Sequence, residues 1–177
     1  MKPHRNFVWL VIALWGMTVG WCAPAQTNDV RLLAEEVVVQ LLGKDKILPV
    51  KEEDLTKFLW DNFANKPEEK RFEKVTNDQW AQKCQIFENA LIRKAKQASL
   101  DGHSLIKSLR AVREETKGLP VLPVGAYLTS QNGNPAWIIV VKWEALSMSG
   151  KPDPMGHVRV FAFDAKSVKL LGGVTCG

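Results

Sequence analysis

The stretch "VGAYLTSQNGNPAWIIVVKWE", residues 124–144, decides the fold of this chain. Its hydrophobic residues alternate with the period of a β-strand on both sides of a short polar turn. The turn contains Asn132-Gly133, the dipeptide that two-residue hairpin turns favour. The second half, 136–144, is apolar on both faces in its middle. We therefore expect an antiparallel hairpin whose second strand is central in its sheet and covered by helices on at least one face.

Two more alternating segments follow, "HVRVFAFD" at 157–164 and "VKLLGGVT" at 168–175, joined by a short turn at 164–167. A longer loop at 145–156 connects them to the first hairpin. Short connections favour a four-stranded antiparallel meander. The hairpin "HVRVFAFDAKSVKLL" resembles the last two strands of PepSY-type and cystatin-like exported domains, in which a strand ends in an Asp-Ala turn. This resemblance covers about 15 of 177 residues, is one of fold alone and implies no functional residue.

Before Pro120 the hydrophobic period is that of helices. We expect one helix over about 27–42, stopped by Gly43, and a second over about 52–65. A third follows the capping-box pattern Thr76-x-x-Gln79, with a core-facing stripe of Trp80, Cys84, Phe87, Leu91, Ala95 and Ala98. A fourth, over about 103–117, turns Leu105, Leu109 and Val112 inward. The expected fold is α+β, with N-terminal helices (about 27–118) packed on a C-terminal four-stranded antiparallel meander sheet (about 122–176).

The first 25 residues have the layout of a secretory signal peptide. Lys2, His4 and Arg5 precede an apolar run, and Ala23-Pro24-Ala25 supplies the small residues of a cleavage site. The run is shorter than the ~20 residues that cross a bilayer. We therefore expect residues 26–177 to form a single soluble domain, secreted or periplasmic, with no membrane span after cleavage. A lipid-anchored envelope component, acylated at Cys22, is the alternative.

The charge balance gives no sign of a nucleic-acid partner. The chain has 24 basic and 19 acidic residues; cleavage would remove Lys2 and Arg5 and no acid, leaving 22 and 19, a net charge of +3. Such a charge favours solubility. The third and fourth helices are basic, with acids interspersed, and this mixture predicts an ordinary solvated face; the residues are Arg93, Lys94, Lys96, Lys107, Arg110, Arg113, Glu88, Glu114 and Glu115.

The mature chain would keep two cysteines, Cys84 and Cys176. In an oxidising compartment a disulfide between them is the expectation, closing a loop of about 93 residues and stabilising the fold by roughly 4–5 kcal/mol. It would explain a cysteine at the penultimate position. With His103 and His157 the same cysteines could form a zinc site, but none of these ligands lies close to another in sequence, unlike typical zinc motifs.

No sequence motif for catalysis is present: there is no GxSxG, HExxH, phosphate loop or dinucleotide fingerprint. His157 and Asp164 are seven positions apart on one expected strand, so they face opposite sides and cannot act as a pair. The sequence does not decide whether the protein is an enzyme, although the lack of a catalytic motif favours a non-enzymatic role. A metal-dependent or thiol enzyme using Cys84, Cys176, His103 and His157 is the alternative function. No cofactor, bound metal or catalytic residue is expected.

We expect an exported binding or accessory protein whose partner is an unknown protein or small molecule in the envelope or outside the cell. Aromatic and polar side chains on one face of the sheet, with methionines of the 145–156 loop, are the candidate ligand-binding residues; they are Trp137, Trp143, His157, Arg159, Phe161, Met148 and Met155.

Overall fold

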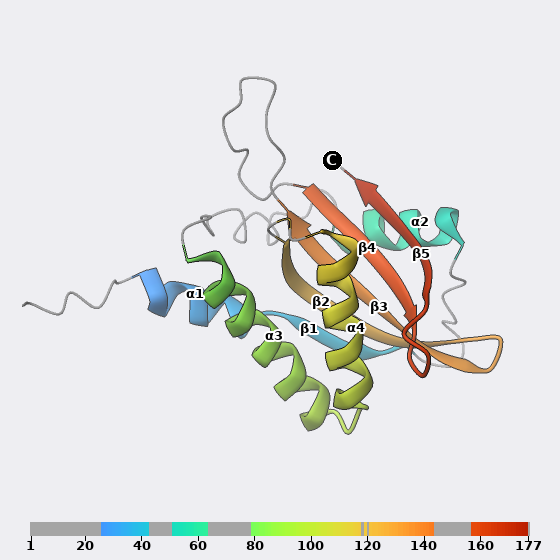
Figure 1. The fold of residues 1–177 in the computed structure, drawn as a ribbon, viewed down its shortest axis with the longest axis horizontal. Coiled ribbons are helices and arrows are strands. Elements are labelled where there is room, and N and C mark those ends of the chain that lie inside the picture. The colour runs from blue at the N-terminus through green and yellow to red at the C-terminus, as the bar shows by residue number, and fades with distance from the viewer. Residues whose placement is uncertain are drawn as a thin grey trace, which may run out of the picture.

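The computed structural model of the protein describes residues 26–42, 51–63, 79–117, 119, 121–143 and 157–176. The leader-like residues 1–25, with Cys22, and the loop residues Met148 and Met155 lie outside these ranges. Over the described ranges the chain forms four helices and five strands (Figure 1), in the order α1 Gln26–Ala34, β1 Val38–Leu41, α2 Glu52–Asn62, α3 Trp80–Gln97, α4 Gly102–Glu115, β2 Val121–Gln131, β3 Asn134–Trp143, β4 His157–Asp164 and β5 Leu170–Cys176. None of these helices has the length and hydrophobicity that crossing a bilayer requires.

The fold is α+β, as expected, but over the described residues the sheet is mixed and has five strands rather than four. Strands β2 to β5 form the predicted antiparallel meander. The fifth strand, β1, pairs in parallel with β2, Val38 opposite Gly125 and Leu41 opposite Leu128. The expectation of four strands was wrong because β1 comes from the segment expected to complete the first helix.

That segment contains three consecutive valines at 37–39, and β-branched side chains favour the extended backbone. Its hydrophobic residues fit a helix spacing as well as a strand, so periodicity alone does not separate the two. Val37 is buried and ties the end of the α1 segment to the core. Pairing with β2 gives β1 its backbone partners.

The β2–β3 hairpin has the predicted two-residue turn. Asn132 and Gly133 both have positive φ, 50° and 78°, as a type I′ turn requires. Strand β3 lies between β2 and β4 and is buried over 136–142. The prediction of a central strand is confirmed.

Helices cover both faces of the sheet (Figure 1). On one face, Trp137 Nε1 of β3 donates a hydrogen bond to Ser104 Oγ of α4 at 2.7 Å. On the other, Tyr127 of β2 makes edge-on ring contacts with Phe58 in α2 and with Phe63, which follows that helix. Helix α3 packs beside α4, over β1 and β2. The core therefore has two layers, one on each side of the central strands.

The predicted disulfide is not formed, because Cys84 is a free thiol. Cys84 Sγ lies 3.0 Å from the carbonyl oxygen of Val121, at the start of β2. The backbone of Cys176 pairs with Val158 on the far side of β4. From β2 to β5 is three strand spacings, about 14 Å, whereas a disulfide joins Cα atoms less than ~7 Å apart. The end of β5 is held by its ladder with β4 instead.

The third helix keeps the middle of its predicted stripe but not its predicted start, and Ala98, predicted to face the core, is exposed just beyond the end of the helix. Phe87, Leu91 and Ala95 are fully buried. Gln79, expected inside the first turn as part of a capping box, precedes the helix with φ 54° and makes no side-chain cap bond. The capping-box prediction was therefore wrong in placing the helix start before Gln79.

Candidate functional site

The geometry of the α3–α4 turn creates a wedge between the two helices. Helix α3 ends in a Schellman motif: Ser99 has φ 56°, and the amide of Leu100 donates to the carbonyl of Ala95 at 2.9 Å. Asp101 then caps α4, its Oδ1 accepting from the amides of His103 and Ser104. From this short turn the two helices diverge (Figure 1).

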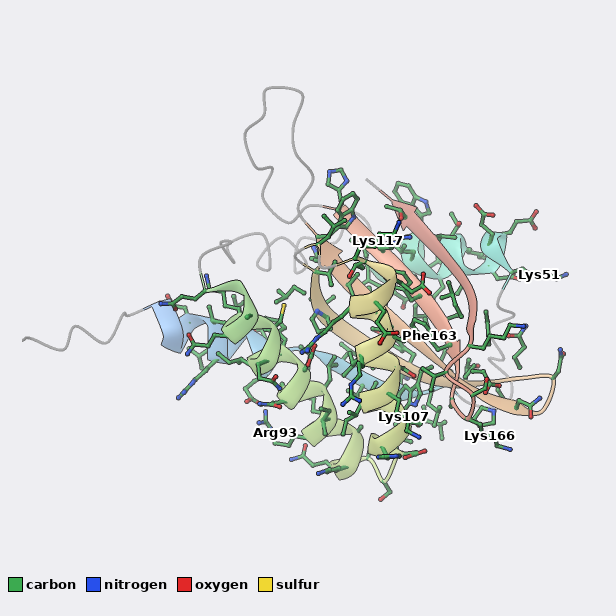
Figure 2. The ribbon with its side chains drawn as sticks, viewed as in Figure 1. Lys51, Arg93, Lys107, Lys117, Phe163 and Lys166 are labelled. Atoms are coloured by element: carbon green, nitrogen blue, oxygen red, sulfur yellow. The ribbon has the colours of Figure 1, made fainter. Side chains whose placement is uncertain are left out.

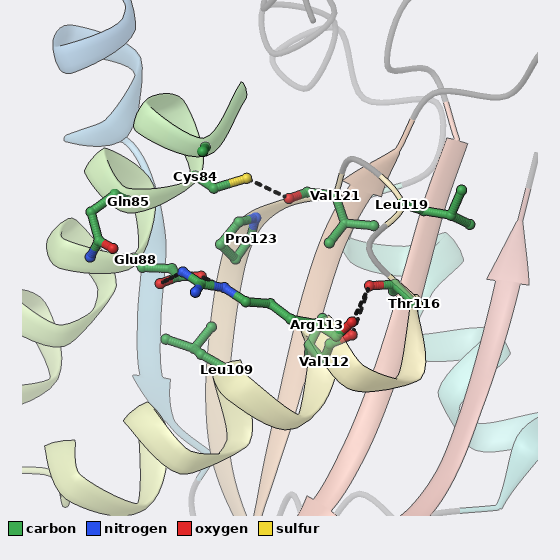
Figure 3. Close-up of a pocket in the computed structure, with 11 residues that line it drawn as sticks. Cys84, Gln85, Glu88, Leu109, Val112, Arg113, Thr116, Leu119, Val121 and Pro123 are labelled. Atoms are coloured by element: carbon green, nitrogen blue, oxygen red, sulfur yellow. Dashed lines mark hydrogen bonds and ion pairs between the residues drawn. The ribbon is translucent and has the colours of Figure 1, made fainter. Parts of the chain in front are cut away.

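A pocket of about 310 Å³ occupies the open end of this wedge, over the start of β2 (Figure 3). Its floor is apolar: Leu109, Val112 and Val121 are buried there. The full lining combines this floor with several polar side chains and comprises Ala81, Cys84, Gln85, Glu88, Leu109, Val112, Arg113, Thr116, Leu119, Val121 and Pro123. An apolar cavity with few polar groups is the usual form of a small-molecule site.

A bidentate ion pair crosses the pocket from α4 to α3 (Figure 3). Arg113 Nε donates to Glu88 Oε1 at 2.8 Å, and Arg113 Nη2 donates to Glu88 Oε2. The Glu88 side chain is 11 % exposed and that of Arg113 is 52 % exposed. A buried carboxylate is retained only with such a partner. Glu88, expected on a solvated face, is instead part of the pocket wall.

Cys84 lines the pocket one helical turn before Glu88 on α3, and its thiol donates to the Val121 carbonyl. Burial raises the pKa of this thiol to about 12; the Glu88 carboxylate adds to the rise and the Arg113 guanidinium partly opposes it. The thiol is thus protonated at physiological pH. Because the thiolate is the nucleophile, Cys84 acts here as a weak donor and a packing group.

Local irregularities in β2 shape the pocket floor. The pairing of β2 with β3 shifts register between Pro123 and Gly125, which marks a bulge. Pairing with β1 begins only at Gly125, so Val121 and Pro123 belong to a part of β2 that pairs on one side within the described chain. A proline, which lacks an N–H, fits such a position.

The predicted sheet-face residues divide into two groups. Trp137 and Phe161 are buried in the core, 0 % and 1 % exposed, so they offer no surface to a ligand. Trp143, His157 and Arg159 are partly exposed and adjoin at one end of the sheet, with the Trp143 and His157 ring centroids 5.4 Å apart. Arg159 Cζ lies 4.6 Å from the ring centroid of Phe161.

The residues of the alternative enzyme site are not brought together. His103 is in the first turn of α4, ten residues before Arg113, or about 15 Å along the helix. His157 is two strands from Val121, about 10 Å, and Cys176 is in β5. Within the described ranges there is no group of three or more His, Cys, Asp or Glu residues that could hold a metal ion.

Some of the basic side chains of α3 serve the fold rather than a partner. Arg93 forms an ion pair with Glu35, and Lys94 Nζ donates to the carbonyls of Glu35 and Val37. These contacts fix the connection between α1 and β1 against α3. Lys107 and Lys117 of the α4 segment are exposed (Figure 2). The basic composition of the two helices is therefore partly structural.

Sequence reasoning missed the pocket and its ion pair. Glu88 and Arg113 are 25 positions apart, and neither belongs to a recognisable motif. The one available signal is that Glu88 follows Cys84 by four positions, which places both on the same side of α3. Comparison of the chain with models of protein families, with curated proteins and with solved structures finds no match. The functional argument therefore rests on the geometry of the pocket and its lining side chains.

Proposed function

We propose that the protein is a non-enzymatic binding protein that holds a small, largely apolar molecule in the wedge pocket between α3, α4 and β2. The observation that carries this proposal is the pocket itself, about 310 Å³ with a buried apolar floor. An apolar cavity of ~150 Å³ is large enough for benzene, so this pocket has about twice that space.

The chemistry of the lining supports binding over catalysis. The Cys84 thiol, with a pKa raised to about 12 by burial, is a poor nucleophile near neutral pH. The Glu88 carboxylate is engaged on both oxygens by Arg113, which leaves it unsuited to take a proton from a substrate. The polar groups that remain can orient a ligand by hydrogen bonds.

We further propose that the chain is exported and acts in the periplasm or outside the cell, either as a soluble protein or anchored through Cys22. The support for export is the leader-like residues 1–25. Mass spectrometry of the mature N-terminus tests it. A terminus at Gln26 supports the soluble form, an acylated Cys22 supports the anchor, and an intact Met1 contradicts export.

Binding can be tested by calorimetry with a neutral apolar probe, 2-naphthalenemethanol. Ala81 lines the pocket at the first turn of α3 and is exposed, so Ala81→Trp should fill the pocket without disturbing the core. We expect it to weaken binding at least about tenfold, the loss of roughly 1.4 kcal/mol. Gln82→Trp is the matched control, because Gln82 is exposed on the same turn and does not line the pocket.

The control should bind as the natural protein does. Absence of saturable binding to the natural protein would refute the proposal. Equal weakening by both tryptophans would place the site elsewhere.

A further inference from the structure

The guanidinium of Arg113 presents an unused edge. Glu88 takes the Nε and one Nη2 hydrogen. Within the described chain no acceptor is bonded to the hydrogens of Nη1 or to the second one of Nη2. These two nitrogens form the end-on fork that binds a carboxylate with two parallel hydrogen bonds. Arg113 lines the pocket and half of its side chain is exposed, so a ligand can reach it.

This fork is already positioned for binding. The ion pair to the largely buried Glu88 holds the guanidinium across the wedge (Figure 3). A ligand therefore meets a side chain whose rotamer freedom has been lost on folding, which lowers the entropic cost of binding. Beside the ion pair lies the apolar floor formed by Leu109, Val112 and Val121. A molecule that combines an anionic group with an apolar body would contact both the fork of Arg113 and the apolar floor.

We propose that the ligand of the wedge pocket is a monocarboxylate with an apolar body about the size of two fused aromatic rings, its carboxylate on the open edge of Arg113. This inference rests on the proposed binding function and adds the ligand class. The size of the apolar body is inferred from the pocket volume, which is about twice that of a cavity that holds benzene.

Electrostatics favour one negative charge over two. In the complex the guanidinium lies between the ligand and Glu88, so the attraction to Arg113 acts over a shorter distance than the repulsion from Glu88. A second negative charge on the ligand would be repelled by Glu88 as well. It would find no second cation to attract it, because Arg113 is the one cationic side chain among the lining residues described. The planar fork matches a planar carboxylate.

The test compares 2-naphthoate with 2-naphthalenemethanol, which has nearly the same body and no charge, by calorimetry at pH 7. We expect the acid to bind the exported chain tenfold to about a hundredfold more tightly, the effect of hydrogen bonds to a charged group. Arg113→Gln should abolish this difference, and Arg113→Lys should reduce it because lysine lacks the fork. Arg110→Gln is the matched control: it removes the same charge from α4 at an exposed position outside the pocket lining.

Arg113→Gln leaves the Glu88 carboxylate without its partner and can destabilise the fold. The double variant Glu88→Gln/Arg113→Gln removes both charges together, and its affinities for the acid and for the alcohol should be equal. If the natural protein binds acid and alcohol equally, the carboxylate inference fails and the binding proposal stands. If Arg110→Gln removes the preference as fully as Arg113→Gln, the inference also fails. If the natural protein binds neither probe, the proposed function itself fails.

Discussion

Replacing Ser104 with alanine should cost about 1–3 kcal/mol of unfolding free energy, the penalty for a buried donor left without an acceptor. The donor is Trp137 Nε1, which gives its hydrogen to Ser104 Oγ at 2.7 Å. Trp137 is 0 % exposed and Ser104 is 4 % exposed, so water has little access to replace the lost oxygen. Ser104 Oγ also donates to the carbonyl of Asp101 at 3.0 Å, and that bond would be lost with it.

Ser108 provides a matched control one helical turn later. It is 0 % exposed, yet its Oγ has no hydrogen-bond partner among the described residues. Ser108→Ala removes an unpaired buried hydroxyl and adds the best helix-forming residue, so it should be neutral or stabilising by up to about 1 kcal/mol. The two substitutions delete the same atom from the same helix, and only the partner differs.

Urea unfolding followed by circular dichroism measures the unfolding free energy of both variants. In thermal unfolding, a loss of 1 kcal/mol should lower the melting temperature of a domain of this size by roughly 2–4 °C. Ser104→Ala should lower the unfolding free energy less in a Trp137→Phe background than in the natural protein, because phenylalanine has no N–H that could be left without an acceptor. Equal costs for Ser104→Ala and Ser108→Ala would refute the reasoning that the Trp137 bond joins α4 to β3.

Three further predictions follow from local geometry. At pH 8, Cys84 of the folded protein should react with iodoacetamide about a thousandfold more slowly than in the unfolded chain, because burial raises its pKa from 9.0 to about 12; peptide mass spectrometry measures the rates, and equal rates would contradict the buried thiol. Asp101→Ala should cost about 0.5–2 kcal/mol at neutral pH. Hydrogen bonding, first from the Ser104 amide, lowers the pKa of Asp101 below 3.8. Its contribution is therefore present above that pH and fades as the pH falls through the folded value; a difference from the natural protein that does not shrink as the solution is acidified would argue against the carboxylate cap. Gly125→Ala should lower the unfolding free energy by about 1–3 kcal/mol, since a Cβ there would lie 3.0 Å from Tyr127 Cε2 and 3.3 Å from Phe63 Cζ. Gly102→Ala is the control, because its Cβ would meet no atom nearer than 3.6 Å and should be tolerated. Similar melting temperatures for both variants would contradict close packing at Gly125.

The elements that the sequence predicted well are those whose local signals agree. In the β2–β3 hairpin the alternation, the β-branched residues and the Asn132-Gly133 turn all point to one structure. In α4 the predicted stripe of Leu105, Leu109 and Val112 is buried, and the structure adds the cap at Asp101. Strand β1 is different, because the run 37–42 satisfies both helix and strand spacing. Its conformation is decided by pairing with residues 125–128, almost 90 positions later, which no local pattern can report.

The disulfide prediction failed for a related reason. Two cysteines in a chain with a leader-like N-terminus are a sound basis for a bridge, but the bridge also needs the two Cα atoms within ~7 Å. That distance depends on strand order, and the meander places β5 three strands from the Val121 that Cys84 contacts. Spacing in sequence carries no information about this separation.

The wedge pocket lies where several local rules are broken together. Pro123 is a proline inside a strand, beside a register shift, and Glu88 is a carboxylate on the buried side of a helix. Cys84 gives its hydrogen bond to the carbonyl of Val121, 37 positions away, rather than to its own helix. Each feature costs stability or regularity taken alone, and sequences usually keep such departures at functional sites rather than elsewhere. Their convergence on one cavity, with an unused fork of Arg113 at its edge, is the physical reason to look for the ligand there before the sheet face.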